Sequence, residues 1–184
     1  MNRKMMLTVA VATVWFAVLS SLVVFAQNKY DVKVPGGLAF AEFRGYESWE
    51  VVAMSANTRV VAVTVGNPVM IAAYKAGFPA NGLAAPDGAR MAKIHWAPKP
   101  NEFFSGTTVQ GNLVNVDFMV KDSQRFADSG GWGYAVFDYD ATTDRFTPGT
   151  ESGMPPQGND AKCGFACHSK VKARDYVFTE YGKR

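Results

Sequence analysis

Asn112-Leu113-Val114-Asn115-Val116-Asp117-Phe118-Met119-Val120-Lys121 alternates between two sets of side chains. Every second residue from Val114 to Val120 is apolar, whereas the residues between them include Asn115 and Asp117. A period of two is that of a β-strand, in which successive side chains point to opposite faces. The stretch therefore predicts a strand over 112–121 with one apolar face and one mixed face.

Three other segments, on both sides of this one, also have strand character. Segment 59–65 is rich in β-branched residues, 89–96 follows a Pro-Asp-Gly turn, and 131–139 is rich in aromatic residues. Pro98 and Pro100 lack the backbone N–H that a sheet ladder needs, so we expect the second segment to end before them. The following stretch 140–159 is polar and rich in proline and glycine, and it predicts a loop.

Helix signals are short and lie between or after the strands. Asn67-Pro68 predicts a helix start, with asparagine as the cap and proline in the first turn, and Gly77 predicts its end after Ala76. A second short helix is expected from 159 to about 171. Together these elements predict an α+β domain, mainly an antiparallel β-sheet with short peripheral helices.

The N-terminus has the pattern of an export signal. Arg3 and Lys4 precede an uncharged, mostly apolar run from 5 to 26, which ends in Val24-Phe25-Ala26 with small residues at the positions that a signal peptidase reads. We expect a signal peptide over 1–26, an extended lead-in over 27–37 and one domain over 38–184. The alternative is an uncleaved membrane anchor. Either reading predicts a periplasmic location.

The charge balance is nearly neutral once the export signal is removed. Of the 19 basic residues in the chain, Arg3 and Lys4 lie within 1–26, so 17 remain against 16 acidic residues. This balance provides no basic surface of the kind that binds nucleic acid, and we expect no nucleic-acid partner.

Cys163-Gly164-Phe165-Ala166-Cys167-His168 is the strongest chemical motif in the chain. CxxCH is the attachment motif of a c-type haem, in which both thiols form thioethers and the adjacent imidazole binds the iron. Cys163 and Cys167 are the only cysteines. The motif predicts one covalently attached haem c with His168 as the iron ligand.

Two other uses of a CxxC pair fit less well. A zinc site needs further cysteine or histidine ligands, and His95 is the only other histidine. A thioredoxin-like redox pair is expected early in a βαβ unit, whereas this motif ends 16 residues before the C-terminus. Helical cytochromes also fit poorly, because the body of this chain has the pattern of β-strands.

A haem motif at the end of an exported β-rich domain resembles the cytochrome P-460 family and its relative cytochrome c′-beta. The resemblance covers nearly all of the chain from about residue 38. It is carried by these motifs: Tyr46-x-x-Trp49, Gly66-Asn67-Pro68, Pro86-Asp87-Gly88, Val120-Lys121-Asp122-Ser123, Gly130-Gly131-Trp132, and Arg174-Asp175-Tyr176-Val177-Phe178-Thr179 after CxxCH.

The resemblance implies a mainly β homodimer with one pentacoordinate haem c per subunit and activity on hydroxylamine and nitric oxide. Its cross-linking lysine corresponds to Lys93, its distal carboxylate to Asp117, and its early-strand arginine to Arg59. Arg59 is open as a partner of a haem propionate or as a surface charge. Lys93 is left open as a cross-link, a distal hydrogen-bond donor or neither. Asp117 is open as a proton acceptor or a solvent-facing residue.

Three functions follow as hypotheses. The first is a haem protein that binds or oxidises small nitrogen species and passes electrons to a cytochrome, with turnover left open. The second is a nitric oxide or carbon monoxide binding protein without turnover. The third is a low-spin electron carrier with Met119, His95 or Lys93 as sixth ligand. Four aromatic residues are open as the wall of a dry pocket or as plain core: Phe78, Phe103, Phe104 and Phe118.

Overall fold

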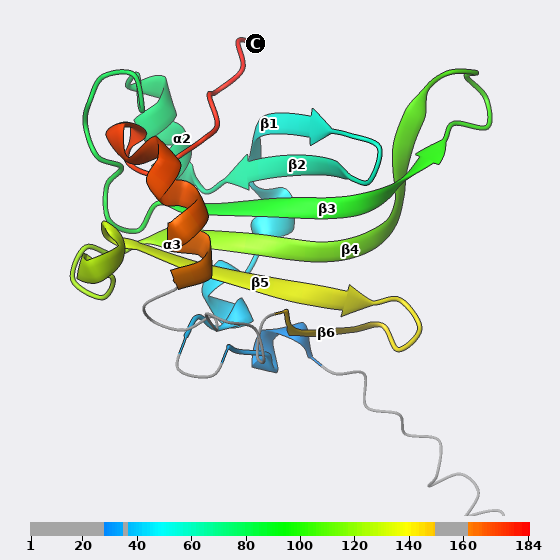
Figure 1. Cartoon of the computed structure of the whole chain (residues 1–184), viewed down its shortest axis with the longest axis horizontal. Helices are drawn as coiled ribbons and strands as arrows, with labels where there is room; N and C mark the ends of the chain where they lie inside the picture. Colours follow the sequence, from blue (N-terminus) through cyan, green and yellow to red (C-terminus); the bar gives the residue numbers. More distant parts are fainter. Residues whose placement is uncertain (1–27, 35–36, 150–161) are drawn as a thin grey trace, which may run out of the picture.

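A computed structural model of the chain describes residues 28–34, 37–149 and 162–184 (Figure 1). The predicted export segment 1–26 and residues 159–161, where the predicted second helix begins, lie outside the described residues. Within the predicted lead-in, Lys29–Asp31 form a short 3-10 turn (η1), and Lys33 forms an isolated bridge with Ala39.

One six-stranded sheet forms the body of the molecule, with its strands in sequence order and every neighbouring pair antiparallel. The predicted α+β fold with a mainly antiparallel sheet is thereby confirmed. The strands are β1 (Glu50–Ala56), β2 (Val61–Gly66), β3 (Arg90–Pro100), β4 (Thr108–Lys121), β5 (Trp132–Asp140) and β6 (Arg145–Pro148).

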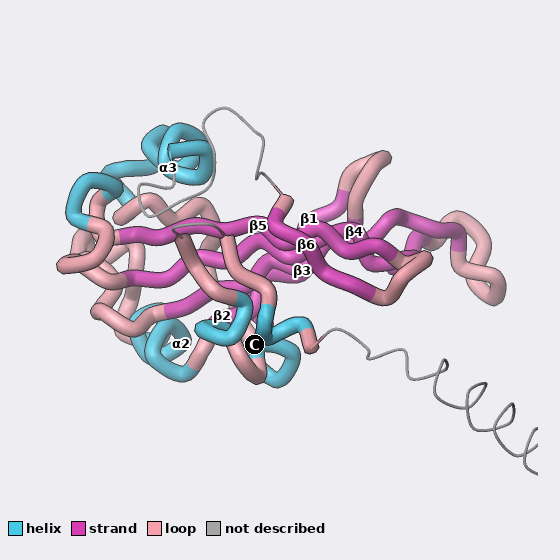
Figure 2. Tube along the Cα trace, turned by 90° about the horizontal axis from the view of Figure 1, so that it is seen from below, coloured by secondary structure: helices cyan, strands magenta, loops and turns pink. Residues whose placement is uncertain are grey.

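Short helices border this sheet. The helix α2 (Pro68–Lys75) begins where Asn67 caps it, because the Asn67 side chain accepts a hydrogen bond from the Met70 amide at 3.0 Å. Helix α3 (Lys162–His168) carries the CxxCH motif, continues into the 3-10 segment η5 (Ser169–Arg174), and lies over one face of the sheet (Figure 2). Three further 3-10 turns are η2 (Phe40–Phe43), η3 (Tyr46–Ser48) and η4 (Ala127–Ser129).

Two strand predictions were wrong. Strand β3 continues through Pro98 and Pro100, which pair with Gln110 and Thr108 of β4. The pairing of β2 with β3 ends at Trp96, so beyond it β3 is an edge strand, where a missing N–H leaves no partner unsatisfied. Strand β6 lies within the stretch 140–159 that was predicted to be a loop. Residues 145–148 form a strand there because a tight turn lets them pair with β5.

The buried side chains form two clusters, which successive residues of β4 enter from opposite faces of the sheet. Phe118 belongs to an aromatic cluster in which Phe40 and Phe43 pack against it, the latter stacked at a centroid distance of 4.1 Å. The adjacent Met119 packs against the second cluster, which α2 and the C-terminal segment help to build. Among the described residues, no helix is both long and apolar enough to span a bilayer.

Candidate functional site

A cavity of about 520 Å³ lies between the sheet and the C-terminal helix. Lys93 of β3 and Asp117 of β4 line it from the sheet side, and Cys167 and His168 of α3 line it from the helix side. Segments that are far apart in the sequence thus bring four of the predicted site residues to one cavity.

The sheet contributes two rows of side chains to this cavity. Each row crosses neighbouring strands at directly paired positions, and the two rows are two residues apart, so both face the same side. The first row is Thr64, Lys93, Asp117 and Val136, and the second is Met91, Met119 and Tyr134. Lys93 and Asp117 therefore stand directly opposite each other on adjacent strands. Except for that pair and two hydroxyl groups, the rows are apolar.

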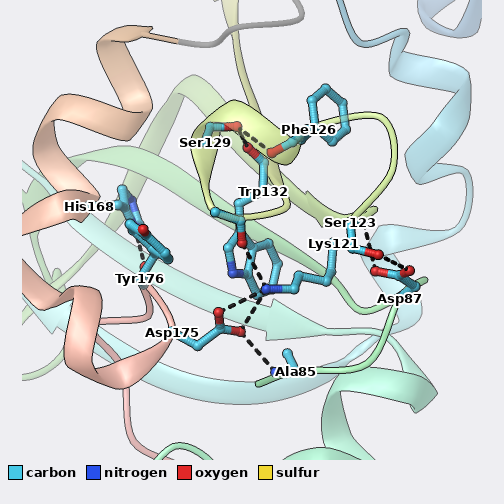
Figure 3. Close-up of polar contacts among 11 residues, drawn as sticks. Ala85, Asp87, Lys121, Ser123, Phe126, Ser129, Trp132, His168, Asp175 and Tyr176 are labelled. Atoms are coloured by element: carbon cyan, nitrogen blue, oxygen red, sulfur yellow. Dashed lines mark hydrogen bonds and ion pairs between the residues drawn. The ribbon is translucent and has the colours of Figure 1, made fainter. Parts of the chain in front are cut away.

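The imidazole of His168 is oriented by a backbone carbonyl. Its Nδ1 donates a hydrogen bond to the carbonyl of Tyr176 at 2.6 Å (Figure 3). A carbonyl can only accept, so Nδ1 carries the proton and Nε2 keeps a free lone pair. The ring centroid lies 4.9 Å from that of Tyr134 and 5.0 Å from that of Phe178. Burial lowers the pKa of His168 and the nearby charge of Lys93 adds to this effect, whereas the hydrogen bond to the Tyr176 carbonyl opposes it. The lowered pKa favours the neutral imidazole, which is the form that binds metals.

Gly164, inside the CxxCH motif, allows helix α3 to lie close to β5. A Cβ atom at this position would lie only 2.4 Å from Cγ of Tyr134, so no larger residue fits without a shift of helix or strand. Cys167 is exposed, and it forms no disulfide with any side chain that the structure describes. The backbone of Cys163 lies in α3, and the position of its thiol is outside the described part of the chain.

Asp117 has an unusual environment for a carboxylate. Its side chain is 37 % exposed, yet Oδ1 is enclosed and has no hydrogen-bond partner among the described residues. Burial raises the pKa of Asp117, and the charges of His95 and Lys93 oppose that rise. An acid with a raised pKa is a stronger proton acceptor when ionised, which suits a general base.

His95 lies next to Asp117 but does not line the cavity. Its Nδ1 is 2.5 Å from the side-chain oxygen of Asn115 and 3.8 Å from Oδ2 of Asp117. Its Nε2 is buried without a hydrogen-bond partner among the described residues. This placement does not favour His95 as a ligand inside the cavity.

The other proposed site residues lie elsewhere. Arg59 is exposed in the turn between β1 and β2, where its backbone N–H donates to the Asn57 side chain at 2.7 Å, and it is not a cavity residue. Its contact with a propionate stays a prediction.

Of the four aromatic candidates, two are core residues and two are neither core nor pocket wall. Phe103 and Phe104 lie in the turn between β3 and β4 and are 88 % and 69 % exposed. Phe78 is buried in the cluster around α2. Of the four aromatic residues only Phe118 borders the cavity, at a position of β4 whose ring is buried in the aromatic cluster on the opposite face. Alternation along β4 placed Phe118 correctly in a strand, but no local pattern indicated that 101–107 forms a protruding turn.

Tyr134, Tyr176 and Phe178 were missed as site residues. Tyr134 lines the cavity, and its hydroxyl is buried without a hydrogen-bond partner among the described residues. The Arg174-to-Thr179 motif contained Tyr176 and Phe178. Tyr176 acts through its backbone carbonyl, however, and every residue type has that group, so the sequence could not indicate it. The alternation of aromatic residues in 131–139 is the signal that would have indicated Tyr134.

A family model described as Cytochrome P460 matches residues 43–179. The matched range contains every residue that lines the cavity, from Ala53 to Thr179. A comparison with curated proteins finds no match.

Proposed function

Because the chain belongs to the cytochrome P460 family, which implies a haem cofactor, we propose that it is a periplasmic mono-haem c protein that binds or oxidises small nitrogen species such as hydroxylamine or nitric oxide. The observation that carries this proposal is the cavity itself. It combines a neutral imidazole with a free Nε2, a cysteine, an amine and a carboxylate of raised pKa in one largely apolar space.

The residues present fit a haem. His168 offers Nε2 as a ligand while Nδ1 is held by Tyr176, which is the usual arrangement of a metal-binding histidine. Cys167 lines the cavity, and Gly164 brings its helix close to the sheet. In this proposal His168 binds the iron, and Cys163 and Cys167 form the two thioethers.

Asp117 acts as the proton acceptor in this proposal. When bound, the haem supplies an iron that can take a small ligand and pass electrons on. Oxidation of hydroxylamine releases protons as well as electrons, and a carboxylate facing the cavity can take up a proton at Oδ1 or Oδ2. The enclosed Oδ1 has no competing donor among the described residues. The electrons leave to an electron-accepting cytochrome.

Lys93 is the second functional group in the proposal. It is paired with Asp117 across β3 and β4, and its charge acts to lower the pKa of both Asp117 and His168. As an ammonium ion it donates hydrogen bonds to a bound ligand. As a neutral amine it is a nucleophile, and it would then be the residue that cross-links to the haem.

A second candidate function is favoured by Met119. This thioether lines the cavity in the row next to Asp117, and a methionine sulfur as sixth ligand is typical of electron-carrying cytochromes. A protein of that kind would be low-spin and closed to gases. The non-catalytic gas-binding alternative differs in having an open ligand position without turnover.

The ferrous absorption spectrum of the purified protein, with and without carbon monoxide, separates these functions. The proposal predicts a high-spin spectrum that changes on addition of carbon monoxide, and oxidation of hydroxylamine in the presence of an electron acceptor. A low-spin spectrum in both oxidation states without carbon monoxide binding contradicts the proposal and supports the carrier. Carbon monoxide binding without turnover supports the gas-binding protein.

Lys93→Leu tests the cross-link. If Lys93 is cross-linked, the wild-type ferrous Soret band is red-shifted and the variant loses that shift. An unchanged ferrous spectrum removes the cross-link from the proposal. Lys99→Leu, on the same strand but outside the cavity, is the matched control.

Export and assembly belong to the same proposal. Segment 1–26 directs the protein to the periplasm, and the mature chain forms a homodimer, as the resemblance implies. Intact mass of protein recovered from the periplasm reveals whether 1–26 has been removed, and light scattering of the purified protein gives the oligomeric state.

A further inference from the structure

Two consecutive residues after the haem motif have a backbone conformation that side chains disfavour. Asp175 has φ of 49° and Tyr176 has φ of 64°, both in the left-handed region, and neither is glycine. Of the remaining described residues other than glycine, only Asp144 has a positive φ. Such a conformation persists only where surrounding contacts fix it, and it often marks a functional site.

Contacts of the Asp175 side chain fix the first of these residues. Lys121, at the end of β4, places Nζ 2.8 and 3.0 Å from the two carboxylate oxygens, and the Ala85 amide donates to Oδ2 at 2.8 Å (Figure 3). The ion pair is buried, with side chains 7 % and 13 % exposed. Nζ also donates to the Gly130 carbonyl at 3.0 Å. Asp175 is thus tied to β4 and to the segment before β3.

Packing of the Tyr176 ring fixes the second residue. The ring is buried against Gly130, where a Cβ atom would lie 2.1 Å from Cε2 of Tyr176. The Tyr176 side chain and the preceding Asp175 are both fixed, so the direction of the Tyr176 carbonyl is fixed as well. This carbonyl accepts the hydrogen bond from Nδ1 of His168.

We propose that Lys121 and Asp175 are positioning residues for His168, because their buried ion pair holds the left-handed segment that aims the Tyr176 carbonyl at Nδ1. This inference rests on the proposed function, in which His168 is the iron ligand. A held Nδ1–H fixes which nitrogen is free and how the ring is turned, and it makes the imidazole a stronger electron donor. The consequence is a lower reduction potential for the iron.

If the Lys121–Asp175 pair only stabilises the fold, substitutions of the pair should have a different effect from the one expected of positioning residues. Removing one partner of a buried ion pair destabilises a protein by leaving an unpaired charge, whereas replacing both partners by neutral residues of similar volume is often neutral. The double variant Lys121→Met with Asp175→Asn therefore separates the two roles. Asparagine tolerates the left-handed region, so the backbone preference at 175 is preserved.

The test compares the double variant with wild type as haem-loaded protein. Two readouts report on the Nδ1 bond: the iron–histidine stretching frequency in the ferrous state, and the exchange rate of the Nδ1 proton with D₂O. The reduction potential is the third. Because the Nδ1 bond strengthens the ligand, its loss should shift the stretching frequency down, make the Nδ1 proton exchange faster, and shift the reduction potential up. The matched control neutralises the half-exposed Arg125–Glu42 pair with Arg125→Met and Glu42→Gln, and should leave all three unchanged.

The outcomes distinguish the inference from the proposed function. If the haem-loaded double variant gives the same three readouts as the control, the inference is overturned and the proposed function is unaffected. Wild-type protein without a bound haem overturns both. If the double variant does not fold, Lys121→Arg is the second variant, and it should shift the same readouts in the same direction by a smaller amount. No shift in that variant also overturns the inference.

Discussion

The two faces of β4 carry different kinds of residues. On one face Val116, Phe118 and Val120 are buried within the aromatic cluster, where phenylalanine rings pack edge-on and stacked. On the other face, Asp117 and Met119 border the cavity. Because side chains alternate along β4, one face of the strand packs into the core that stabilises the fold, and the other face borders the cavity where chemistry can take place. Substitutions on the first face should change stability, and substitutions on the second should change function.

Phe40→Ala should have the largest effect on stability. The Phe40 ring is fully buried and packs against Phe118, Phe137 and Phe146, so its removal should lower the free energy of unfolding by about 3–5 kcal/mol. Chemical denaturation of the haem-loaded protein measures this. Phe103→Ala, at an exposed position, should change it by less than about 0.5 kcal/mol. Equal effects of the two would contradict the assignment of the stabilising face.

Asp117→Asn should reduce hydroxylamine oxidation by roughly 100-fold, equivalent to about 2.7 kcal/mol of barrier, because a proton acceptor is lost. Steady-state rates with an artificial electron acceptor measure the effect. Asp140→Asn removes the same charge from an exposed position on the neighbouring strand, at a residue that does not shift the pKa of Asp117, and should leave the rate unchanged. A wild-type rate in the Asp117 variant would remove this residue from the catalytic account.

Gly164→Ala should disturb the contact between helix α3 and the sheet. The added methyl group would overlap the Tyr134 ring, and overpacking of this kind costs about 1–3 kcal/mol. Thermal denaturation gives the stability, and the ferrous spectrum reports on His168. Gly182→Ala is a suitable control, since a Cβ there meets nothing within 4 Å. If both variants behave alike, helix α3 does not pack against β5 as described.

A smaller effect concerns the pH dependence of stability. The pKa of Asp117 is raised in the folded protein, so the folded state binds its proton more tightly than the unfolded chain. Stability from this group is therefore present at low pH and is lost as the pH rises through the ordinary carboxyl pKa toward the raised one. Asp117→Asn should gain stability relative to wild type over that interval, by a small amount because the side chain is partly exposed. Denaturation at several pH values checks this, and a relative loss of stability would contradict the sign.

Local signals in the sequence predicted the elements that depend on neighbouring residues. The helix α2 begins at Asn67-Pro68 as expected, and β4 follows its alternation. The end of β3 was misjudged because the tolerance for Pro98 and Pro100 depends on how far β2 extends, which is not a local property. Strand β6 was missed for the same reason, because only its pairing with β5 makes it a strand.

The residues of the candidate site also fall into those that a local sequence signal indicated and those that only the tertiary structure brings together. CxxCH indicated Cys167 and His168 directly, while Lys93 and Asp117 were candidates by resemblance, and only the register of β3 and β4 pairs them. Nothing in the sequence indicated that a backbone carbonyl at Tyr176 orients His168, or that Lys121 and Asp175 hold that carbonyl in place. These contacts depend on tertiary packing around a left-handed segment.

The central claim is that Cys163 and Cys167 attach a haem within this cavity. The most direct test is the intact mass of the denatured protein, produced in cells that have the haem-attachment machinery. The expected mass is that of the polypeptide plus one haem, retained after denaturation because thioether bonds are covalent. The mass of the unmodified polypeptide would contradict it.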